Sequence, residues 1–268
     1  MRVFLDNELM YSSPANYSPA ADLLKDRVVL VTGAGQGIGQ CAALTYAQHG
    51  ATVLLLGRNQ KRLDAVFDEI MDSGYPEPMV LKLDLAKADD QQFNAMAQAI
   101  FEQLGRLDGI LHNAARFEGL MPLQLQALEP WLGALRVNLA APIALTRACW
   151  PLLTRAPDAS VVFTSETHGH TPAAFWGAFA VSKAGLEAAV KIWAEELAPY
   201  PHLRMNTIVP GAVRSPQRLI SHPGENREQL ASIESLMPLY LYLMGADSHG
   251  QNGRIFEAQT ADLFQVEL

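Results

Sequence analysis

The sequence predicts an α/β protein in which a single doubly wound parallel sheet carries helices on both faces. Short apolar runs alternate with segments of helical spacing from residue 26 onward. Such alternation requires crossover connections, and crossover connections build parallel sheets. The strand-like runs are also apolar almost throughout, which is typical of strands that are covered on both faces. These observations together favour one layered domain.

The predicted elements follow one another in a regular order. The strand-like runs are 27–32, 51–57, 79–84, 107–113, 160–165, 203–209 and 253–259. Helical spacing occupies 38–49, 59–73, 88–104 and 232–245. Residues 213–232 interrupt the alternation with a polar stretch that contains proline, and long irregular segments in compact domains are often lids. We therefore expect a lid there.

Length and composition limit the possible classes of protein. The chain has 268 residues, which suits a single domain over 26–268 preceded by an extended arm over 1–25. Hydrophobic residues make up 49 % and charged residues 18 %, which is enough for a core and excludes a disordered chain. The 28 acidic residues exceed the 20 basic ones, giving a net charge of −8. Such a chain is a poor candidate for a nucleic-acid partner.

Cysteine usage and hydropathy point to the cytoplasm. The two cysteines, Cys41 and Cys149, form no C-x-x-C motif and suit a reducing compartment. We expect both to pack in helices. The longest apolar runs fall short of the ~18 residues of a membrane span, and the start of the chain does not resemble a signal peptide. No membrane partner is expected.

A glycine-rich stretch directly follows the first strand-like run. It reads Thr32-Gly33-Ala34-Gly35-Gln36-Gly37-Ile38-Gly39, with the spacing G-x-x-x-G-x-G. Glycines there would let the backbone approach a pyrophosphate, and the N-terminus of the next helix would attract the negative charge. The alternative is a plain turn. The strand–loop–helix context favours a cofactor site.

Further motifs appear in order along the chain: Asp84-Leu85 at the end of the third strand-like run, Asn113-Ala114-Ala115 at the end of the fourth, then Asn138, Lys183, and Pro210-Gly211 after the sixth, followed by Ser215. Together with the glycine-rich stretch they resemble the motifs of the short-chain dehydrogenase/reductase family over roughly 26–258. The resemblance implies a Rossmann-like fold that binds a nicotinamide dinucleotide. The implied cofactor contacts, beyond the glycine-rich loop, are Asp84 and Leu85 at the adenine, Asn113 in Asn113-Ala114-Ala115, Lys183, Pro210-Gly211, and Ser215 at the nicotinamide carboxamide. Asn138 corresponds to the structural and catalytic asparagine of the family. Taken singly, Asp84 could merely cap a helix and Pro210-Gly211 could merely form a turn.

The resemblance also implies self-association. Family members commonly pair through two long helices, which here correspond to about 128–155 and 179–198. We therefore expect a homodimer or homotetramer. Apolar residues at helical spacing in these segments fit an interface, and they would equally fit the core beneath each helix.

The end of the second strand favours NADP(H) over NAD(H). An NAD site usually carries a carboxylate at this point for the ribose 2′-OH. Here the chain reads Leu56-Gly57-Arg58-Asn59, so Arg58 is available for a 2′-phosphate. The alternative is that Arg58 only solvates the start of a helix.

The reaction site departs from the family pattern at two positions. Phe179 stands four residues before Lys183, where the family has a tyrosine that exchanges a proton with the substrate oxygen. Phenylalanine has no exchangeable proton. Glu166 stands where the family has a serine that polarises the carbonyl, and its neighbour Ser165 is expected on the opposite face of the strand, with a lesser alternative that it turns in. An ionised Glu166 could form an ion pair with Lys183.

Three functional hypotheses follow. The first is an NADP(H)-binding protein with little or no carbonyl reduction. The second is altered chemistry, in which Glu166 acts as a protonated acid or stabilises a cationic iminium substrate. The third is ordinary reduction with His168 or His170 as a replacement donor, although both could simply be solvated loop residues.

Aromatic residues near the expected mouth of the site suggest a bulky or apolar small-molecule ligand. They are Phe117, beside Arg116, and Phe175 and Trp176 ahead of Phe179. The same side chains could instead pack beneath the lid. No metal is expected, because the only candidate spacing is H-x-H on a loop.

Overall fold

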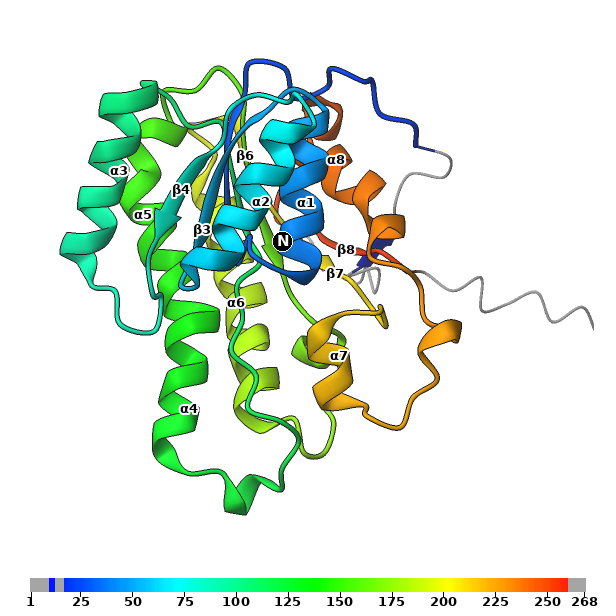
Figure 1. Ribbon diagram of the computed structural model, residues 1–268. Helices are drawn as coiled ribbons and strands as arrows, with labels where there is room; N and C mark the ends of the chain where they lie inside the picture. The colour runs from blue at the N-terminus through cyan, green and yellow to red at the C-terminus, as the bar shows by residue number, and fades with distance from the viewer. Residues whose placement is uncertain (1–9, 13–16, 260–268) are drawn as a thin grey trace, which may run out of the picture.

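A parallel sheet forms the centre of the computed structural model, which describes residues 10–12 and 17–259. Eight strands pair in the order β1-β8-β7-β6-β5-β2-β3-β4 (Figure 1), and every pairing in this sheet is parallel. The strands are β1 Met10–Ser12, β2 Val28–Thr32, β3 Thr52–Gly57, β4 Met79–Lys82, β5 Gly109–His112, β6 Ala159–Thr164, β7 Leu203–Val209 and β8 Ile255–Glu257. The predicted fold class is confirmed.

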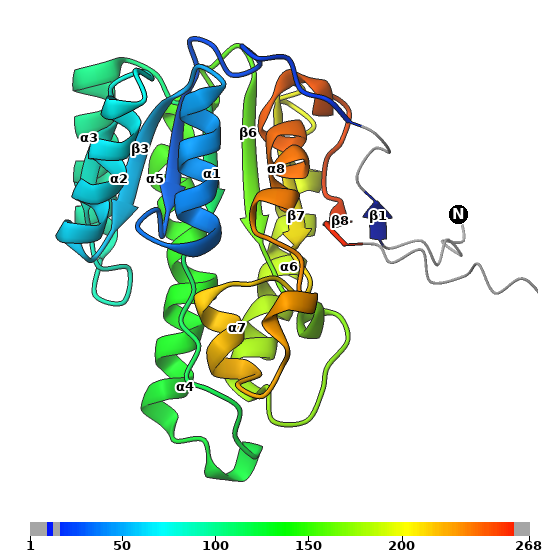
Figure 2. The same ribbon diagram turned by 45° about the vertical axis from the view of Figure 1, so that its right-hand side comes forward.

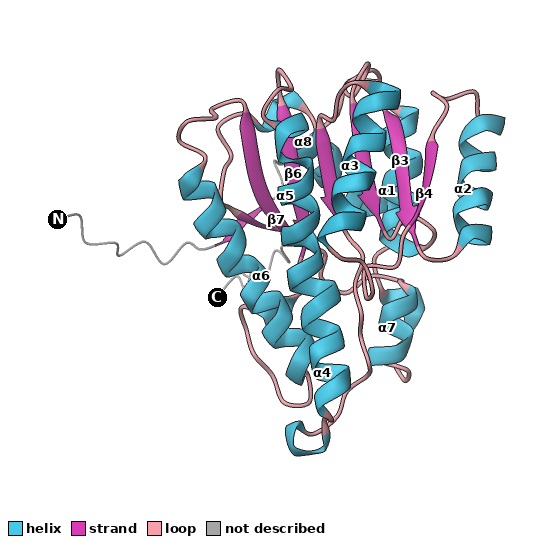
Figure 3. Ribbon diagram, turned by 90° about the vertical axis from the view of Figure 1, so that its left-hand side faces the viewer, coloured by secondary structure: helices cyan, strands magenta, loops and turns pink. Residues whose placement is uncertain are grey.

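Helices cover both faces of this sheet, as Figures 1 and 3 show. One face carries α1 Gly37–Gln48, α2 Gln60–Asp72 and α8 Met237–Met244. The other carries α3 Asp90–Leu104, α5 Ala141–Leu153 and α6 Gly177–Glu196. Each layer encloses its own cluster of buried apolar side chains, so that both faces of the central strands are dry.

The first of the two long helices expected from the resemblance contains a π-helical turn. Helical backbone runs without a break through α4 Leu128–Leu135, the π-helical turn Arg136–Ala140 and α5, close to the expected range 128–155. The side chain of Asn138 in that turn accepts a hydrogen bond from the backbone N–H of Arg116 and donates to the hydroxyl of Ser182. These tertiary bonds anchor the turn. Single π-helical turns inside α-helices occur frequently at functional sites.

Several segments extend beyond the carboxyl ends of the strands. In Figure 2, α4, the start of α6 and α7 lie together below the sheet. Helix α7 spans Pro216–Ser221, and a short 3₁₀ turn spans Arg227–Gln229. Most of the expected lid segment 213–232 is therefore structured, and a bridge between Val213 and Ala231 joins its two ends.

The described residues of the predicted arm make contacts with the sheet and with nearby loops of the same chain. Met10–Ser12 pair with β8 at one edge of the sheet. Leu24 is fully buried, and its backbone N–H donates to the carbonyl of His49. The hydroxyl of Tyr17 donates to Asp247. Residues 1–9 and 13–16 of the arm lie outside the described residues.

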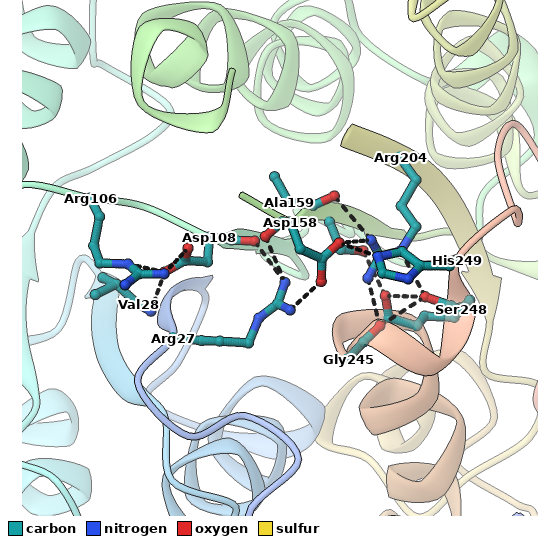
Figure 4. A network of polar contacts seen from close by, with 12 residues as sticks. Arg27, Val28, Arg106, Asp108, Asp158, Ala159, Arg204, Gly245, Ser248 and His249 are labelled. Carbon is teal, nitrogen blue, oxygen red and sulfur yellow. Dashed lines mark hydrogen bonds and ion pairs between the residues drawn. The ribbon is translucent and has the colours of Figure 1, made fainter. Parts of the chain in front are cut away.

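A network of charged side chains closes the amino ends of the strands, opposite the glycine-rich loop (Figure 4). Asp158 forms ion pairs with Arg27 and Arg204, and His249 lies 2.8 Å from the same carboxylate. Burial by itself raises the pKa of Asp158, but the hydrogen bonds and charges of Arg204 and Arg27 outweigh it and hold this pKa well below its ordinary value. The carboxylate therefore stays ionised in the folded protein.

Replacing Asp158 by asparagine should destabilise the fold by about 3 kcal/mol at pH 7, because two largely buried guanidinium groups lose their counter-charge. A carboxyl with a depressed folded pKa stabilises the protein above its unfolded pKa of about 3.9, and this stabilisation is lost as the pH falls through the folded value. Below about pH 5 the free energy of unfolding of the variant should therefore fall less steeply with decreasing pH than that of the natural protein. Urea unfolding as a function of pH measures both effects.

Asp90→Asn is the matched control for this experiment. Asp90 pairs with Arg147, and both side chains are more than half exposed. Exposed pairs contribute at most about 1 kcal/mol. Equal effects of the two substitutions would contradict a structural role for the Asp158 network.

Candidate functional site

A cavity of about 770 Å³ lies at the carboxyl ends of the strands. The loops that follow β2, β3, β4, β5, β6 and β7 all contribute to its wall. Strand β2 stands between β5 and β3, where the strand order reverses, and ligands of open α/β sheets bind at this point. The predicted residues that border the cavity are Gly33, Gln36, Gly37, Ile38, Arg58, Asp84, Leu85, Asn113, Glu166, Phe179, Lys183, Pro210, Gly211 and Ser215.

Two predicted residues, Gly39 and Asn138, do not line the cavity but contact residues that form its wall. A Cβ atom at Gly39 would collide with the carbonyl oxygen of Gly33, so this glycine lets α1 pack close against the loop. Asn138 is buried, and its amide is engaged by the backbone of Arg116 and by Ser182. Its contribution to the site is structural in this arrangement.

The glycine-rich loop is held from the neighbouring strand. The hydroxyl of Thr32 accepts hydrogen bonds from the backbone N–H groups of Asn113 and Ala114, which ties the end of β2 to the end of β5. Helix α1 then begins at Gly37, and Gln36 provides no side-chain cap for it. The first N–H groups of α1 are thus available to an anion in the cavity.

Two guanidinium groups stand at the end of the cavity formed by β3. Arg58 follows β3 directly, and Arg62 lies in the first turn of α2. Arg62 donates to the side-chain oxygen of Gln36, so it links α2 to the glycine-rich loop. Asn59 between them caps α2 by accepting from the backbone N–H of Arg62. This arrangement provides positive charge for a phosphate.

Arg62 was not among the residues predicted from the sequence. Its place in the sequence could have indicated that it lies near the cavity, because the helix after a parallel strand begins at the carboxyl edge of the sheet. The first turn of 59–73 therefore had to lie near Arg58. The sequence did not show that a contact with Gln36 would hold Arg62 at the cavity.

Lys183 and Phe179 lie at the opposite end of the cavity. The Nζ atom of Lys183 donates to the carbonyl of Thr164 at 2.6 Å and lies 5.7 Å from the centre of the Phe179 ring. Phe179 is buried and packs against Phe117 and Trp176. Burial lowers the pKa of Lys183 to about 8, although the charges of Glu166 and Glu187 act in the opposite direction.

The ion pair expected between Glu166 and Lys183 is not formed. The carboxylate of Glu166 instead accepts a hydrogen bond of 2.7 Å from the backbone N–H of His168 and caps the 3₁₀ turn Thr167–Gly169. The lysine is directed to Thr164, so backbone groups satisfy both side chains. Glu166 still borders the cavity and acts on Lys183 through its charge.

The hydroxyl of Ser165 does not take the place of the missing serine. It donates to the carboxylate of Glu187 on α6, although Ser165 itself borders the cavity. This agrees with the expectation that neighbouring strand residues point to opposite faces. Glu187 was not singled out in the sequence.

The two loop histidines stand away from the cavity wall. The ring of His168 packs on Trp176 with centroids 4.2 Å apart, and that of His170 points toward Glu187. Neither is among the residues that line the cavity. His112 is buried and bonded to Thr146, and burial with the nearby charge of Lys183 lowers its pKa to about 3. It is therefore neutral near pH 7.

Ser215 combines two contacts. It borders the cavity and also caps α7, because its hydroxyl accepts from the backbone N–H of Arg218. Cys149 is buried in the apolar cluster on one face of the sheet, and the partly buried Cys41 packs against the cluster on the other face. Both cysteines lie in helices, as the sequence predicted. Among the described residues no group of three or more ligating side chains could hold a metal ion. The described helices also include none long and apolar enough to span a membrane.

The fold, with its glycine-rich loop at the switch point, defines a Rossmann-like α/β protein. Within that class the chain belongs to the short-chain dehydrogenase family, whose model, described as short chain dehydrogenase, matches residues 27–222. It is 41 % identical over 244 residues to the uncharacterised oxidoreductase YciK of Escherichia coli K12, covering 91 % of this chain and 96 % of that protein.

Two solved relatives were crystallised with a cofactor. A short-chain dehydrogenase of Escherichia coli CFT073 complexed with NADPH shares 41 % identity at a TM-score of 0.87, covering 90 % of this chain and 100 % of that one. A short-chain dehydrogenase of Shigella flexneri 2a complexed with NADP shares 40 % identity at a TM-score of 0.87, with the same coverage of 90 % and 100 %.

Proposed function

We propose that this chain is an NADP(H)-binding member of the family in which ordinary carbonyl reduction is weak or absent. The proposal rests on one observation: the same cavity contains a set of groups suited to NADP(H) and lacks a proton donor beside Lys183. Arg58 and Arg62 stand at the end where a 2′-phosphate would bind, and Phe179 stands beside Lys183 where a proton donor is needed.

The residues present fit the cofactor along the whole cavity. The uncapped N-terminus of α1 would bind the pyrophosphate, and Arg58 with Arg62 would bind the 2′-phosphate. Asp84 and Leu85 border the cavity where the family holds adenine, and Lys183 borders it where the family holds the nicotinamide ribose. When bound, NADPH supplies a hydride. The two relatives solved with NADPH and NADP support this assignment.

The proton of carbonyl reduction has no donor at the usual place. Phe179 carries no exchangeable proton, and the hydroxyl of Ser165 is engaged by Glu187. Glu166 borders the cavity where the family has a polarising serine, and the negative charge of its side chain opposes the alkoxide that develops during reduction. Loss of the general acid alone costs on the order of 10²–10⁴-fold in rate.

Calorimetric titration with NADPH and NADH, followed by assay on a small panel of carbonyl compounds, tests the proposal. We expect NADPH to bind more tightly than NADH, with no carbonyl turnover above background. Rapid turnover of any simple ketone or aldehyde by the natural protein would contradict the proposal that carbonyl reduction is weak or absent. Failure to bind either cofactor would overturn the whole proposal.

A second candidate function is the reduction of a preformed iminium. Such a substrate already carries positive charge, so hydride delivery completes the reaction without an enzyme proton. The Glu166 carboxylate and the rings of Phe117 and Phe179 border the same cavity, and both kinds of group attract cations. Glu166→Gln should then lower iminium reduction by about 10-fold, from the loss of one charge-assisted contact. Full activity of this variant on a cyclic iminium would exclude the hypothesis.

We also infer that the chain forms a homodimer or homotetramer. Leu128 and Leu132 on α4, and Val181 and Ile192 on α6, are exposed large apolar side chains on the two helices through which the family commonly pairs. Light scattering on the purified protein measures the assembled mass. A monomer at micromolar concentration would contradict the inference.

A further inference from the structure

Glu187 is a buried carboxylate that the cofactor site does not explain. It lies on α6 one turn after Lys183, and only 5 % of its surface is exposed. Two side chains from the loop after β6 reach it. The Ser165 hydroxyl donates to its Oε1 atom, and Nδ1 of His170 lies 3.4 Å from the same oxygen. Burying a carboxylate is costly unless it is hydrogen-bonded and faces a positive charge.

The backbone of the loop after β6 packs closely against this carboxylate. A Cβ atom at Gly169 would lie 2.7 Å from Oε1 of Glu187 and 3.1 Å from Cβ of Lys183. Only a residue without a side chain leaves this space open, so the loop backbone packs directly against both charged residues. His170 also approaches β8, where its Nε2 atom lies 3.8 Å from Glu257. The loop after β6 therefore reaches Glu187 through Ser165 and His170, and His170 also lies near β8.

Lys183 needs counter-charge from more than one side. It is 3 % exposed, and the groups that face it are the carbonyl of Thr164, the carboxylates of Glu166 and Glu187, and the neutral His112 of β5. Glu166 borders the open cavity, where solvent or a ligand can screen it. Glu187 lies on the same helix one turn after the lysine, and it is not among the residues that line the cavity.

We propose that Glu187, held by Ser165 and His170, is a positioning residue that supplies a fixed, buried counter-charge to Lys183 beside the nicotinamide ribose of NADP(H). This inference rests on the proposed cofactor function. The phenol that accompanies this lysine in the family is replaced here by the ring of Phe179, which cannot accept a hydrogen bond through an oxygen. The charge of Lys183 therefore depends on the surrounding carboxylates and on the Thr164 carbonyl.

The test is the pH dependence of NADPH binding by Glu187→Gln, compared with the natural protein and measured by calorimetry between pH 6 and pH 9. Removal of the carboxylate should move deprotonation of Lys183 to lower pH, because one of the charges that raise its pKa is lost. If the shift is about one pH unit, the variant binds NADPH about 5-fold more weakly at pH 8 and less than about 2-fold more weakly at pH 6. The ratio to the natural protein is compared at each pH, which cancels the titration of the cofactor phosphate.

Glu195→Gln is the matched control, since it removes an exposed carboxylate from the same helix. Its binding profile should superimpose on that of the natural protein. Ser165→Ala provides a second variant that keeps the charge but removes a hydrogen bond to it. The carboxylate that faces Lys183 remains, so the pH dependence of NADPH binding should follow that of the natural protein.

The outcomes separate this inference from the proposed function. Weaker binding by Glu187→Gln at pH 8 but not at pH 6 supports the positioning role. Loss of affinity by the same factor at every pH, or none at all, overturns it and leaves Glu187 a structural residue. Should Glu187→Gln not fold, Glu187→Met, which also removes the charge, is measured in its place and judged by the same two outcomes. If the natural protein binds no NADPH at any pH, the proposed function fails and this inference fails with it.

Discussion

The double variant Phe179→Tyr with Glu166→Ser should reduce simple carbonyl compounds with NADPH about 10²–10⁴-fold faster than the natural protein. The first substitution supplies a phenolic proton beside Lys183, whose Nζ atom already lies 5.7 Å from the ring centre. The second removes a carboxylate from the cavity and supplies a neutral hydrogen-bond donor. Initial rates with a panel of aldehydes and ketones measure the gain.

The single variants separate the two contributions. Phe179→Tyr alone restores the acid but leaves negative charge near the developing alkoxide, so we expect a smaller gain than in the double variant. Glu166→Ser alone lacks an acid and should remain close to background. If the double variant binds NADPH normally but reduces nothing on the panel, the cavity has changed in shape as well as in chemistry. The proposal that only the proton donor and its neighbour were lost would then be wrong.

Arg58→Asp should weaken NADPH binding by about 100-fold while leaving NADH binding unchanged or improved. A charge-assisted hydrogen bond contributes about 1.5–3 kcal/mol, and an aspartate at this place also repels the 2′-phosphate. The same carboxylate could accept hydrogen bonds from the free ribose of NADH. Arg62→Ala should weaken NADPH binding by about 10-fold, since Arg62 also borders the cavity and donates to Gln36.

Lys61→Ala is the control for these two substitutions. It removes one positive charge from the same turn of α2, yet Lys61 does not border the cavity. NADPH binding by this variant should stay within about 2-fold of the natural protein at physiological salt, where exposed charges are screened. Equal losses for Lys61→Ala and Arg58→Asp would show that general positive charge, rather than a defined phosphate contact, controls affinity.

Much of the site could be predicted because a parallel sheet gathers the ends of its strands. Arg58, Asp84 and Asn113 are far apart in the sequence, yet each lies within two residues of the end of a strand, so each reaches the same edge. The strand periodicity was sufficient for this step, and β7 has the bounds predicted from its apolar run. The identities of Phe179 and Glu166 were equally visible, because a residue type needs no coordinates.

Tertiary structure decided which polar groups meet. The sequence suggested an ion pair between Glu166 and Lys183, whereas backbone groups of His168 and Thr164 bind them instead. It also gave no sign that Ser165 would turn to Glu187, or that bonds from Asn138 would anchor a π-helical turn between α4 and α5. The physical reason is one of scale. Repeating patterns of apolar residues determine the elements and their order, but a hydrogen bond depends on distances of about 3 Å between segments that only packing brings together.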